Sequence, residues 1–179
     1  MLSMLSFDRD FLLYLQSIRT PVMDNIMKFI TKFGDAGLFW IGLAVILLIT
    51  KKFRKTGLGM LIALTIGAII TNVILKNWIA RPRPYVTIDD LICIIGPQKD
   101  FSFPSGHSTA SIAASLSMFL TMPKRYGIPA LIFGLLICFS RLYVGVHYPT
   151  DVIAGIMIGA ASAVVSLFIV KKVTAARSK

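Results

Sequence analysis

Three short polar clusters interrupt an otherwise apolar chain of 179 residues, and both of its histidines lie inside them. The first cluster pairs a lysine with an arginine, the second is a Ser-Gly-His turn, and the third joins an arginine, a histidine and an aspartate. Cations, backbone donors, a nucleophile and a proton donor are the groups that phosphoryl transfer requires. The clusters are Lys76 with Arg83-Pro84, Pro104-Ser105-Gly106-His107, and Ser140-Arg141 with His147 and Asp151.

The second cluster lies where a polar loop leads into an apolar run, which predicts a helix N-terminus near Ser105. Free backbone amides at such a terminus point toward an anion. Gly106 lets a phosphate approach the backbone closely, and the hydroxyl of Ser105 adds a donor. Taken alone, the same residues fit a plain N-cap followed by an exposed histidine, His107.

The third cluster contains an imidazole and a carboxylate four residues apart. Pro149 favours a helix start, so Asp151 is expected in the first turn of the last apolar helix, with His147 just before it. The carboxylate can then accept the Nδ1 hydrogen of His147 and fix the tautomer that presents Nε2 as a nucleophile. By itself, Asp151 fits equally well as a carboxylate at the positive end of a helix dipole.

In their order and spacing, the clusters resemble the signature of the type 2 phosphatidic acid phosphatase family, K-x6-RP, PSGH and S-R-x5-H-x3-D. The resemblance implies a reaction without metal or other cofactor. His147 attacks phosphorus to give a phosphohistidine, Asp151 orients His147, and His107 protonates the leaving group. The phosphate oxygens would be held by Lys76, Arg83, Ser105, Gly106 and Arg141. Vanadium-dependent haloperoxidases share these motifs, but they are soluble and much longer proteins.

Two arginines compete for the first cluster, because Arg81-Pro82 directly precedes Arg83-Pro84. Only Arg83 has the family spacing from Lys76, so Arg81 is left as a lipid-headgroup contact. Without the resemblance, Lys76 and Arg83 would be interpreted as interfacial anchors at the end of a membrane span.

The composition is that of a membrane protein, with 56% hydrophobic residues and a mean hydropathy of +0.78. Two long runs, Gly57–Leu75 and Val152–Val170, carry no charge and can each cross a hydrocarbon core of roughly 30 Å. Gly155 and Gly159 form a GxxxG pattern that favours close helix packing. The fold class is therefore an all-α polytopic bundle of about five to six transmembrane helices. Three shorter spans are expected at Ala36–Thr50, Ser108–Met122 and Gly127–Ser140.

The first 35 residues read as amphipathic helices rather than as a span. Residues 7–19 have apolar side chains at helical spacing, with Asp8 on the polar side, which predicts an interfacial helix. Pro21 can begin a second helix through Phe33, and Gly34 to Gly37 then turns the chain into the first span. No basic segment of a cleaved signal peptide is found. Residues 1–179 are interpreted as a single domain, with the transmembrane catalytic core in 36–179.

The net charge of +11 has a topological explanation rather than indicating nucleic-acid binding, since the basic residues stand mostly at the ends of apolar runs. By the positive-inside rule, the connection at 51–55, the connection at 124–125 and the C-terminal tail are cytoplasmic. The connections at 76–107 and 141–151 then lie outside, and these carry all three clusters. We therefore expect a multi-pass protein of the cell (inner or plasma) membrane whose active site faces the extracytoplasmic side. Charges of the long outer loop, Asp100 among them, are expected to be solvated.

An outer-face site restricts the substrates to lipid phosphates displayed there, with membrane lipids as the surrounding partners. Undecaprenyl diphosphate and phosphatidylglycerophosphate are the leading candidates, followed by phosphatidic acid and lipid A 1-phosphate. A protein that binds or transports a lipid phosphate without cleaving it is the alternative. The pairing of His147 with Asp151 favours catalysis, because holding an anion needs cations but no oriented nucleophile.

Overall fold

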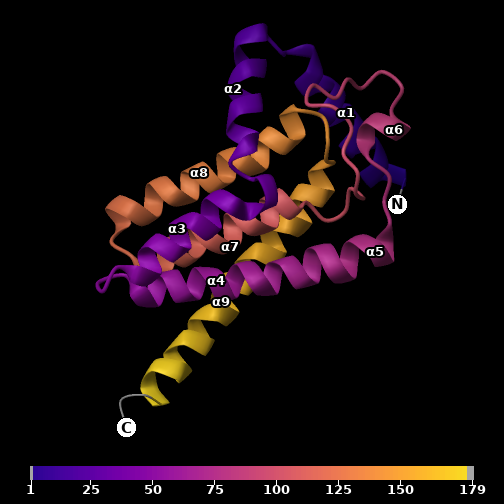
Figure 1. Cartoon of the computed structure of the whole chain (residues 1–179). Coiled ribbons are helices and arrows are strands. Elements are labelled where there is room, and N and C mark those ends of the chain that lie inside the picture. Colours follow the sequence, from indigo (N-terminus) through magenta and orange to yellow (C-terminus); the bar gives the residue numbers. More distant parts are fainter. Residues whose placement is uncertain (1, 177–179) are drawn as a thin grey trace.

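The computed structural model describes residues 2–176, and over this part of the chain it is all-helical with no β-strand (Figure 1). The all-α prediction is thus confirmed. The first helices are α1 (Leu2–Ser17), α2 (Pro21–Lys32), α3 (Leu38–Ile49) and α4 (Arg54–Ala68), and α4 continues through a π-helical stretch (Ile69–Leu75) into α5 (Lys76–Ile79). They are followed by α6 (Pro84–Thr87), α7 (Gly106–Thr121), α8 (Lys124–Tyr143) and α9 (Pro149–Ala176).

Among the described residues, three helical segments are long and apolar enough to cross a membrane: Arg54–Thr87, Lys124–Tyr143 and Pro149–Ala176. They contain three of the five expected spans. A fourth crossing results if Pro21–Lys32 and Asp35–Ile49, which meet at a bend of 42°, act as one broken span. The remaining expected span falls on α7, which has only 16 residues. The membrane-helix character is therefore established, while the number of crossings stays a prediction.

The bend between α2 and α3 is made by the short glycine-flanked turn that the sequence predicted. Thr20 caps α2 by accepting a hydrogen bond from the amide of Met23, and Pro21 occupies its first turn. Ala36 and Gly37 then adopt positive φ angles of 49° and 67°, which break the helix. Such angles cost little at glycine but are strained at alanine. This turn places Asp35 beside the second polar cluster.

Helix α7 lies at the centre of the bundle and packs against α4, α8 and α9. Its buried face is built largely from small hydroxyl side chains, which lets its neighbours approach closely. A Cβ at Gly159 of α9 would lie 2.6 Å from the carbonyl oxygen of Thr109, and one at Gly155 would lie 2.7 Å from that of Ser105. The GxxxG prediction of close packing is confirmed. Since neighbouring helices cover α7, it can be short and rich in serine: Ser108, Ser111, Ser115 and Ser117 are all buried.

Helix α1 contributes to the core instead of lying apart from the bundle. Leu12 and Leu15 are buried in a cluster with Leu142 and Val152, from α8 and α9. The opposite side of α1 exposes large apolar side chains, including Tyr14. Its predicted place in the membrane interface stays a prediction.

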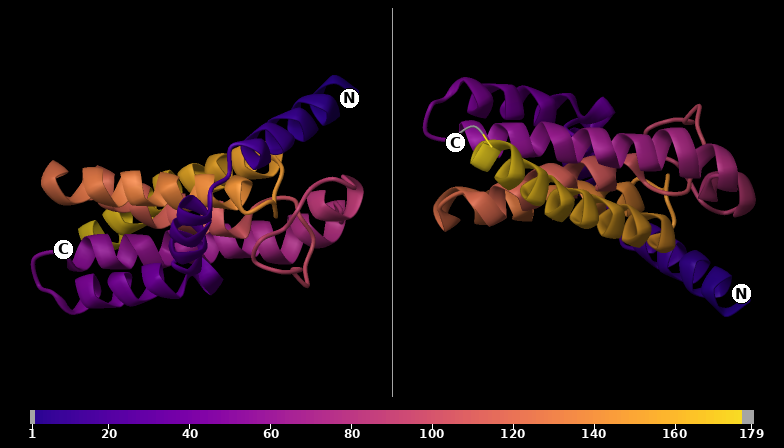
Figure 2. Two further views of the ribbon diagram at one scale, coloured as in Figure 1. Left: turned by 90° about the horizontal axis from the view of Figure 1, so that it is seen from above. Right: turned by 90° about the horizontal axis from the view of Figure 1, so that it is seen from below.

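The two ends of the bundle differ in composition. The connection between α3 and α4, the start of α8 and the C-terminal end of α9 lie at one end (Figure 2). The segment from α5 through α6 and the long loop that follows lie at the other end, as does the loop between α8 and α9 (Figure 1). The strongly basic connections are thus gathered opposite the three polar clusters, as the alternation of spans predicted.

Candidate active site

The three polar clusters, distant in sequence, converge at the loop end of the bundle. Lys76 begins α5, Arg83 immediately precedes α6, His107 lies in the first turn of α7, and Asp151 lies in the first turn of α9. His147 occupies the loop between α8 and α9. Except for His107, these side chains are buried, although all five are ionisable. Buried charges are tolerated only when partners compensate them, so the contacts of each group indicate its task.

His147 and Asp151 form the pair that their spacing predicted. The Nδ1 atom of His147 lies 3.5 Å from Oδ2 of Asp151, and both side chains are almost fully buried. The same oxygen of Asp151 accepts hydrogen bonds from the backbone amide of Tyr148 at 3.0 Å and from the hydroxyl of Ser102. The carboxylate is therefore held behind the imidazole by Tyr148 of the loop between α8 and α9 and by Ser102 of the loop before α7.

The other ring nitrogen of His147, Nε2, lies 3.0 Å from NH1 of Arg83. A guanidinium can only donate hydrogen bonds, so Nε2 must be the unprotonated nitrogen and Nδ1 must carry the hydrogen toward Asp151. Burial lowers the pKa of His147 well below its usual value, and the nearby charges of Arg83 and Arg141 lower it further. The arrangement thus presents a neutral imidazole whose unprotonated Nε2 accepts a hydrogen bond from a cation.

Lys76 and Arg83 share one carboxylate, that of Asp100, whose two oxygens each accept from one of them. Burial raises the pKa of Asp100, but the hydrogen bonds and charges of Lys76 and Arg83 outweigh it and lower the pKa to about 2. Asp100 is thus not merely a solvated loop charge, although its side chain is 53% exposed. A carboxylate bridging two cations marks a place suited to a phosphate.

Arg141 is the most deeply placed cation of the site, at 2% exposure. Its NH1 donates to the hydroxyl of Thr31 on α2 at 2.5 Å. Its Nε is buried and has no hydrogen-bond partner within the described part of the chain. An unpaired buried donor on a charged group is costly, which is the expected state of a group whose partner is a bound anion.

Ser105 is the N-cap of α7, as predicted, and its hydroxyl accepts hydrogen bonds from the amide and the hydroxyl of Ser108. His107 follows two residues later, and its Nε2 atom lies 3.0 Å from Oδ1 of Asp35. A carboxylate only accepts, so Nε2 carries a hydrogen and Nδ1 is left for another partner. Gly34 packs against this ring, since a Cβ there would come within 2.3 Å of it.

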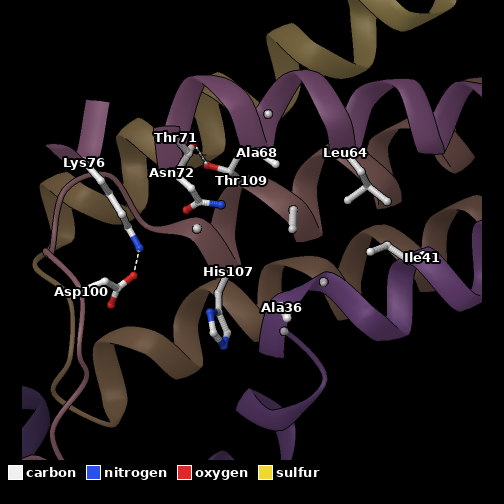
Figure 3. Close-up of a pocket in the computed structure, with 15 residues that line it drawn as sticks. Ala36, Ile41, Leu64, Ala68, Thr71, Asn72, Lys76, Asp100, His107 and Thr109 are labelled. Carbon is white, nitrogen blue, oxygen red and sulfur yellow. Dashed lines mark hydrogen bonds and ion pairs between the residues drawn. The ribbon is translucent and has the colours of Figure 1, made fainter. Parts of the chain in front are cut away.

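A cavity of about 340 Å³ opens between α3, α4 and α7 (Figure 3). Lys76, Asp100 and His107 lie toward one end of it, and Asn72 points into it from the π-helical stretch. The other end is lined by apolar side chains, including Ile41 and Leu64. A polar head and an apolar chamber within one cavity suit an amphiphilic ligand.

Arg81 does not face outward as a headgroup contact. Its NH1 donates to Oδ1 of Asp151 at 2.6 Å, and its NH2 donates to Oδ2 of Asp8 at 2.9 Å. The guanidinium also stacks on the ring of Tyr148, 3.7 Å from the ring centroid. Arg81 therefore belongs to the framework behind Asp151.

Three acidic residues near the site, Asp8, Asp35 and Asp100, were not selected by sequence reasoning. Asp35 stands in a glycine-flanked helix break, which is the one local signal that could have drawn attention to it. Asp8 and Asp100 have no such signal, because each meets its partner only through the fold.

Comparison with known proteins assigns the chain to a family. The profile of the PAP2 superfamily matches residues 56–175, which include all three clusters. The chain belongs to the PAP2 superfamily. Helices α1 to α3, with Asp8 and Asp35, lie outside the matched region.

Two relatives within the PAP2 superfamily are named undecaprenyl-diphosphatases. The one from Sulfolobus acidocaldarius is 35% identical over 137 residues, covering 76% of this chain and 66% of the relative. The one from Bacillus subtilis is 37% identical over 146 residues, covering 79% of this chain and 72% of the relative. The chain thus spans about two thirds to three quarters of these relatives.

A solved PAP2 structure shares the architecture as well. The crystal structure of a transmembrane PAP2-type phosphatidylglycerolphosphate phosphatase from Bacillus subtilis superposes with a TM-score of 0.75 at 30% identity, covering 96% of this chain and 86% of that one. Together the relatives identify the chain as a membrane-embedded lipid phosphatase of the PAP2 type.

Proposed function

We propose that the chain hydrolyses a lipid phosphate or diphosphate through a phosphohistidine at His147, without a metal ion. The observation that carries this proposal is the position of the His147 imidazole. Its unprotonated Nε2 lies 3.0 Å from the Arg83 guanidinium, and the Asp151 carboxylate stands behind Nδ1. An oriented neutral nucleophile next to a cluster of cations is what attack on phosphorus requires.

In the first step, Arg83 moves its hydrogen bond from Nε2 of His147 to a phosphate oxygen. The freed Nε2 lone pair forms a bond to phosphorus while the bond from phosphorus to the leaving oxygen breaks. For this step His107 carries a second hydrogen on Nδ1, which it gives to that oxygen while Asp35 holds Nε2. Asp151 faces the Nδ1 hydrogen of the phosphohistidine and stabilises its positive charge.

Cations and backbone amides hold the phosphate throughout. Lys76, Arg83 and Arg141 neutralise the equatorial oxygens, while Ser105 and the amide of Gly106 act at the N-terminus of α7. Asp100 must give up its place between Lys76 and Arg83 when the phosphate enters. In the second step, water attacks phosphorus, His107 accepts the proton, and the bond to Nε2 breaks to release inorganic phosphate.

The apolar end of the cavity supports a substrate with a long hydrocarbon tail. Undecaprenyl diphosphate is the first candidate, because two relatives are named undecaprenyl-diphosphatases. Phosphatidylglycerophosphate is the second candidate, because a similar solved structure is that of a phosphatidylglycerolphosphate phosphatase. Phosphatidic acid and lipid A 1-phosphate follow. The clustering of basic connections at the opposite end of the bundle supports an active site on the extracytoplasmic face of the cell membrane.

The alternative function is binding or transport of a lipid phosphate without cleavage. The pairs His147–Asp151 and His107–Asp35 argue against a binding or transport protein, since neither pair would be needed to hold an anion.

Release of inorganic phosphate by the purified chain tests the proposal. The panel comprises undecaprenyl diphosphate, phosphatidylglycerophosphate, phosphatidic acid and a lipid A 1-phosphate, each in detergent, with the His147→Ala variant as control. We expect wild-type turnover of at least one lipid and none by the variant. Binding of these lipids without phosphate release by the wild type would instead support the binding protein.

A further inference from the structure

A buried carboxylate on α1 lies next to the proposed catalytic apparatus without touching the cavity. The side chain of Asp8 is 1% exposed, whereas Asp10, one half-turn further along the same helix, is exposed. Burying a carboxylate is costly unless charged or hydrogen-bonding partners compensate it. The partners of Asp8 therefore show what its burial achieves.

The first partner is Arg81, whose guanidinium is shared between two carboxylates. Its NH2 lies 2.9 Å from Asp8 and its NH1 lies 2.6 Å from Asp151. The planar guanidinium is further held by stacking on Tyr148. Charges thus alternate from Asp8 to Arg81 to Asp151, and the last of these faces His147.

The second partner is Thr150, the residue before Asp151. Its backbone amide donates to Oδ1 of Asp8 at 3.2 Å, and its hydroxyl donates to Oδ2 at 2.6 Å. The hydroxyl also accepts from Arg81 at 2.7 Å. Asp8 therefore satisfies a free amide in the first turn of α9, the turn that carries Asp151.

We propose that Asp8 is a positioning residue for the nucleophile, acting on Asp151 through both Arg81 and Thr150. The inference rests on the proposed function of His147 and extends it to α1, which the superfamily profile does not cover. Besides His147, Asp151 has Arg81 as a salt-bridge partner. One of the two terminal nitrogens of Arg81 binds Asp151 and the other binds Asp8, so Asp8 helps to orient the guanidinium.

When Asp8 loses its charge, Arg81 is no longer held between two anions, and its hydrogen bond to Oδ1 of Asp151 is weakened. The Tyr148 amide and the Ser102 hydroxyl still hold Oδ2, so the carboxylate keeps its place while its orientation toward Nδ1 of His147 changes.

The test compares Asp8→Asn with Asp10→Asn in the purified full chain. Asparagine keeps the shape and can still accept from Thr150, but it carries no charge for Arg81. We expect Asp8→Asn to lower kcat by about 10- to 100-fold with KM nearly unchanged, because the substrate does not touch this residue. Asp10→Asn should behave as the wild type, and Asp8→Glu should recover part of kcat by restoring the charge.

A readout without substrate separates this inference from the proposed function. The chain has two histidines, so nitrogen NMR of its imidazoles, assigned with His147→Ala, reports on each ring directly. We expect Asp8→Asn to shift the His147 signals and to leave those of His107 in place, even if the wild type were to cleave none of the lipids in the panel. Unchanged His147 signals would overturn the positioning role, as would a loss of kcat matched by an equal loss of folded protein in thermal unfolding.

Discussion

At the scale of residues, each proposed catalytic imidazole is held by a carboxylate, but the two carboxylates come from different sources. Asp151 follows His147 in the chain by four residues, so a pattern of spacing could predict it. Asp35 reaches His107 from the turn between α2 and α3, and only the fold brings the two together. The residues of the three clusters were therefore predictable, whereas the acidic groups that balance them were not.

Titration of His147 provides a direct check of its environment. Burial, with Arg83 and Arg141 nearby, lowers the pKa of His147, so its neutral form persists to lower pH than in a free imidazole. Nitrogen NMR of a His107→Gln variant follows this single remaining imidazole. We expect it to be neutral at pH 6.5, the usual midpoint. A midpoint at or above 6.5 would show that the ring is neither buried nor next to the cations.

The cations of the site should make added metal unnecessary. In the proposed mechanism, Lys76, Arg83 and Arg141 supply positive charge to the phosphate oxygens, so we expect the same activity with and without EDTA. Vanadate should inhibit, because it is a phosphate-like anion that can bind to the same cations. An activity lost in EDTA and regained with magnesium would point to a metal-dependent reaction.

At the scale of elements, the sequence reveals long apolar helices more readily than buried polar ones. The helices containing Gly57–Leu75 and Val152–Val170 were predictable from length and hydropathy alone. Helix α7 is short and rich in serine because α4, α8 and α9 shield it, and hydropathy does not report shielding. The turn between α2 and α3 likewise hid from sequence reasoning that these two helices together are long and apolar enough for one broken span.

Close packing of α9 on α7 should make Gly159 sensitive to the smallest enlargement. A Cβ at Gly159 would lie 2.6 Å from the carbonyl oxygen of Thr109, whereas a Cβ at Gly42 of α3 meets nothing within 4 Å. Gly159→Ala should cost about 1–3 kcal/mol and lower the melting temperature in detergent. Gly42→Ala is the matched control and should not lower it. Equal melting temperatures for the two variants would contradict the close contact.

At the scale of the whole molecule, the charge pattern and the fold agree on which segments share an end of the bundle. The positive-inside rule adds which end faces the cytoplasm. Four basic residues lie between Lys51 and Lys55, and further ones lie in the tail. The charge distribution along the sequence was therefore sufficient to predict that the three clusters share one end of the bundle. It was not sufficient to establish the number of crossings.

Cysteine labelling in intact cells tests this orientation. In a background without Cys93, a cysteine at Asp89 should react with a membrane-impermeant thiol reagent, because this exposed position lies in the loop that the charge pattern predicts to be outside. Cysteines at Arg54 or Lys172, which are also exposed, should react only after lysis. Labelling of Arg54→Cys in intact cells would invert the orientation and place the site in the cytoplasm.

The central claim is that His147 carries the phosphoryl group, and trapping that group tests it most directly. The purified chain is mixed with a lipid phosphate that it turns over, quenched in alkali within one turnover, and digested for mass spectrometry. We expect a phosphate on the peptide containing His147, a smaller and slower yield from Asp151→Asn, and none from His147→Ala. Turnover by His147→Ala, or a phosphate on His107 instead, would contradict the account.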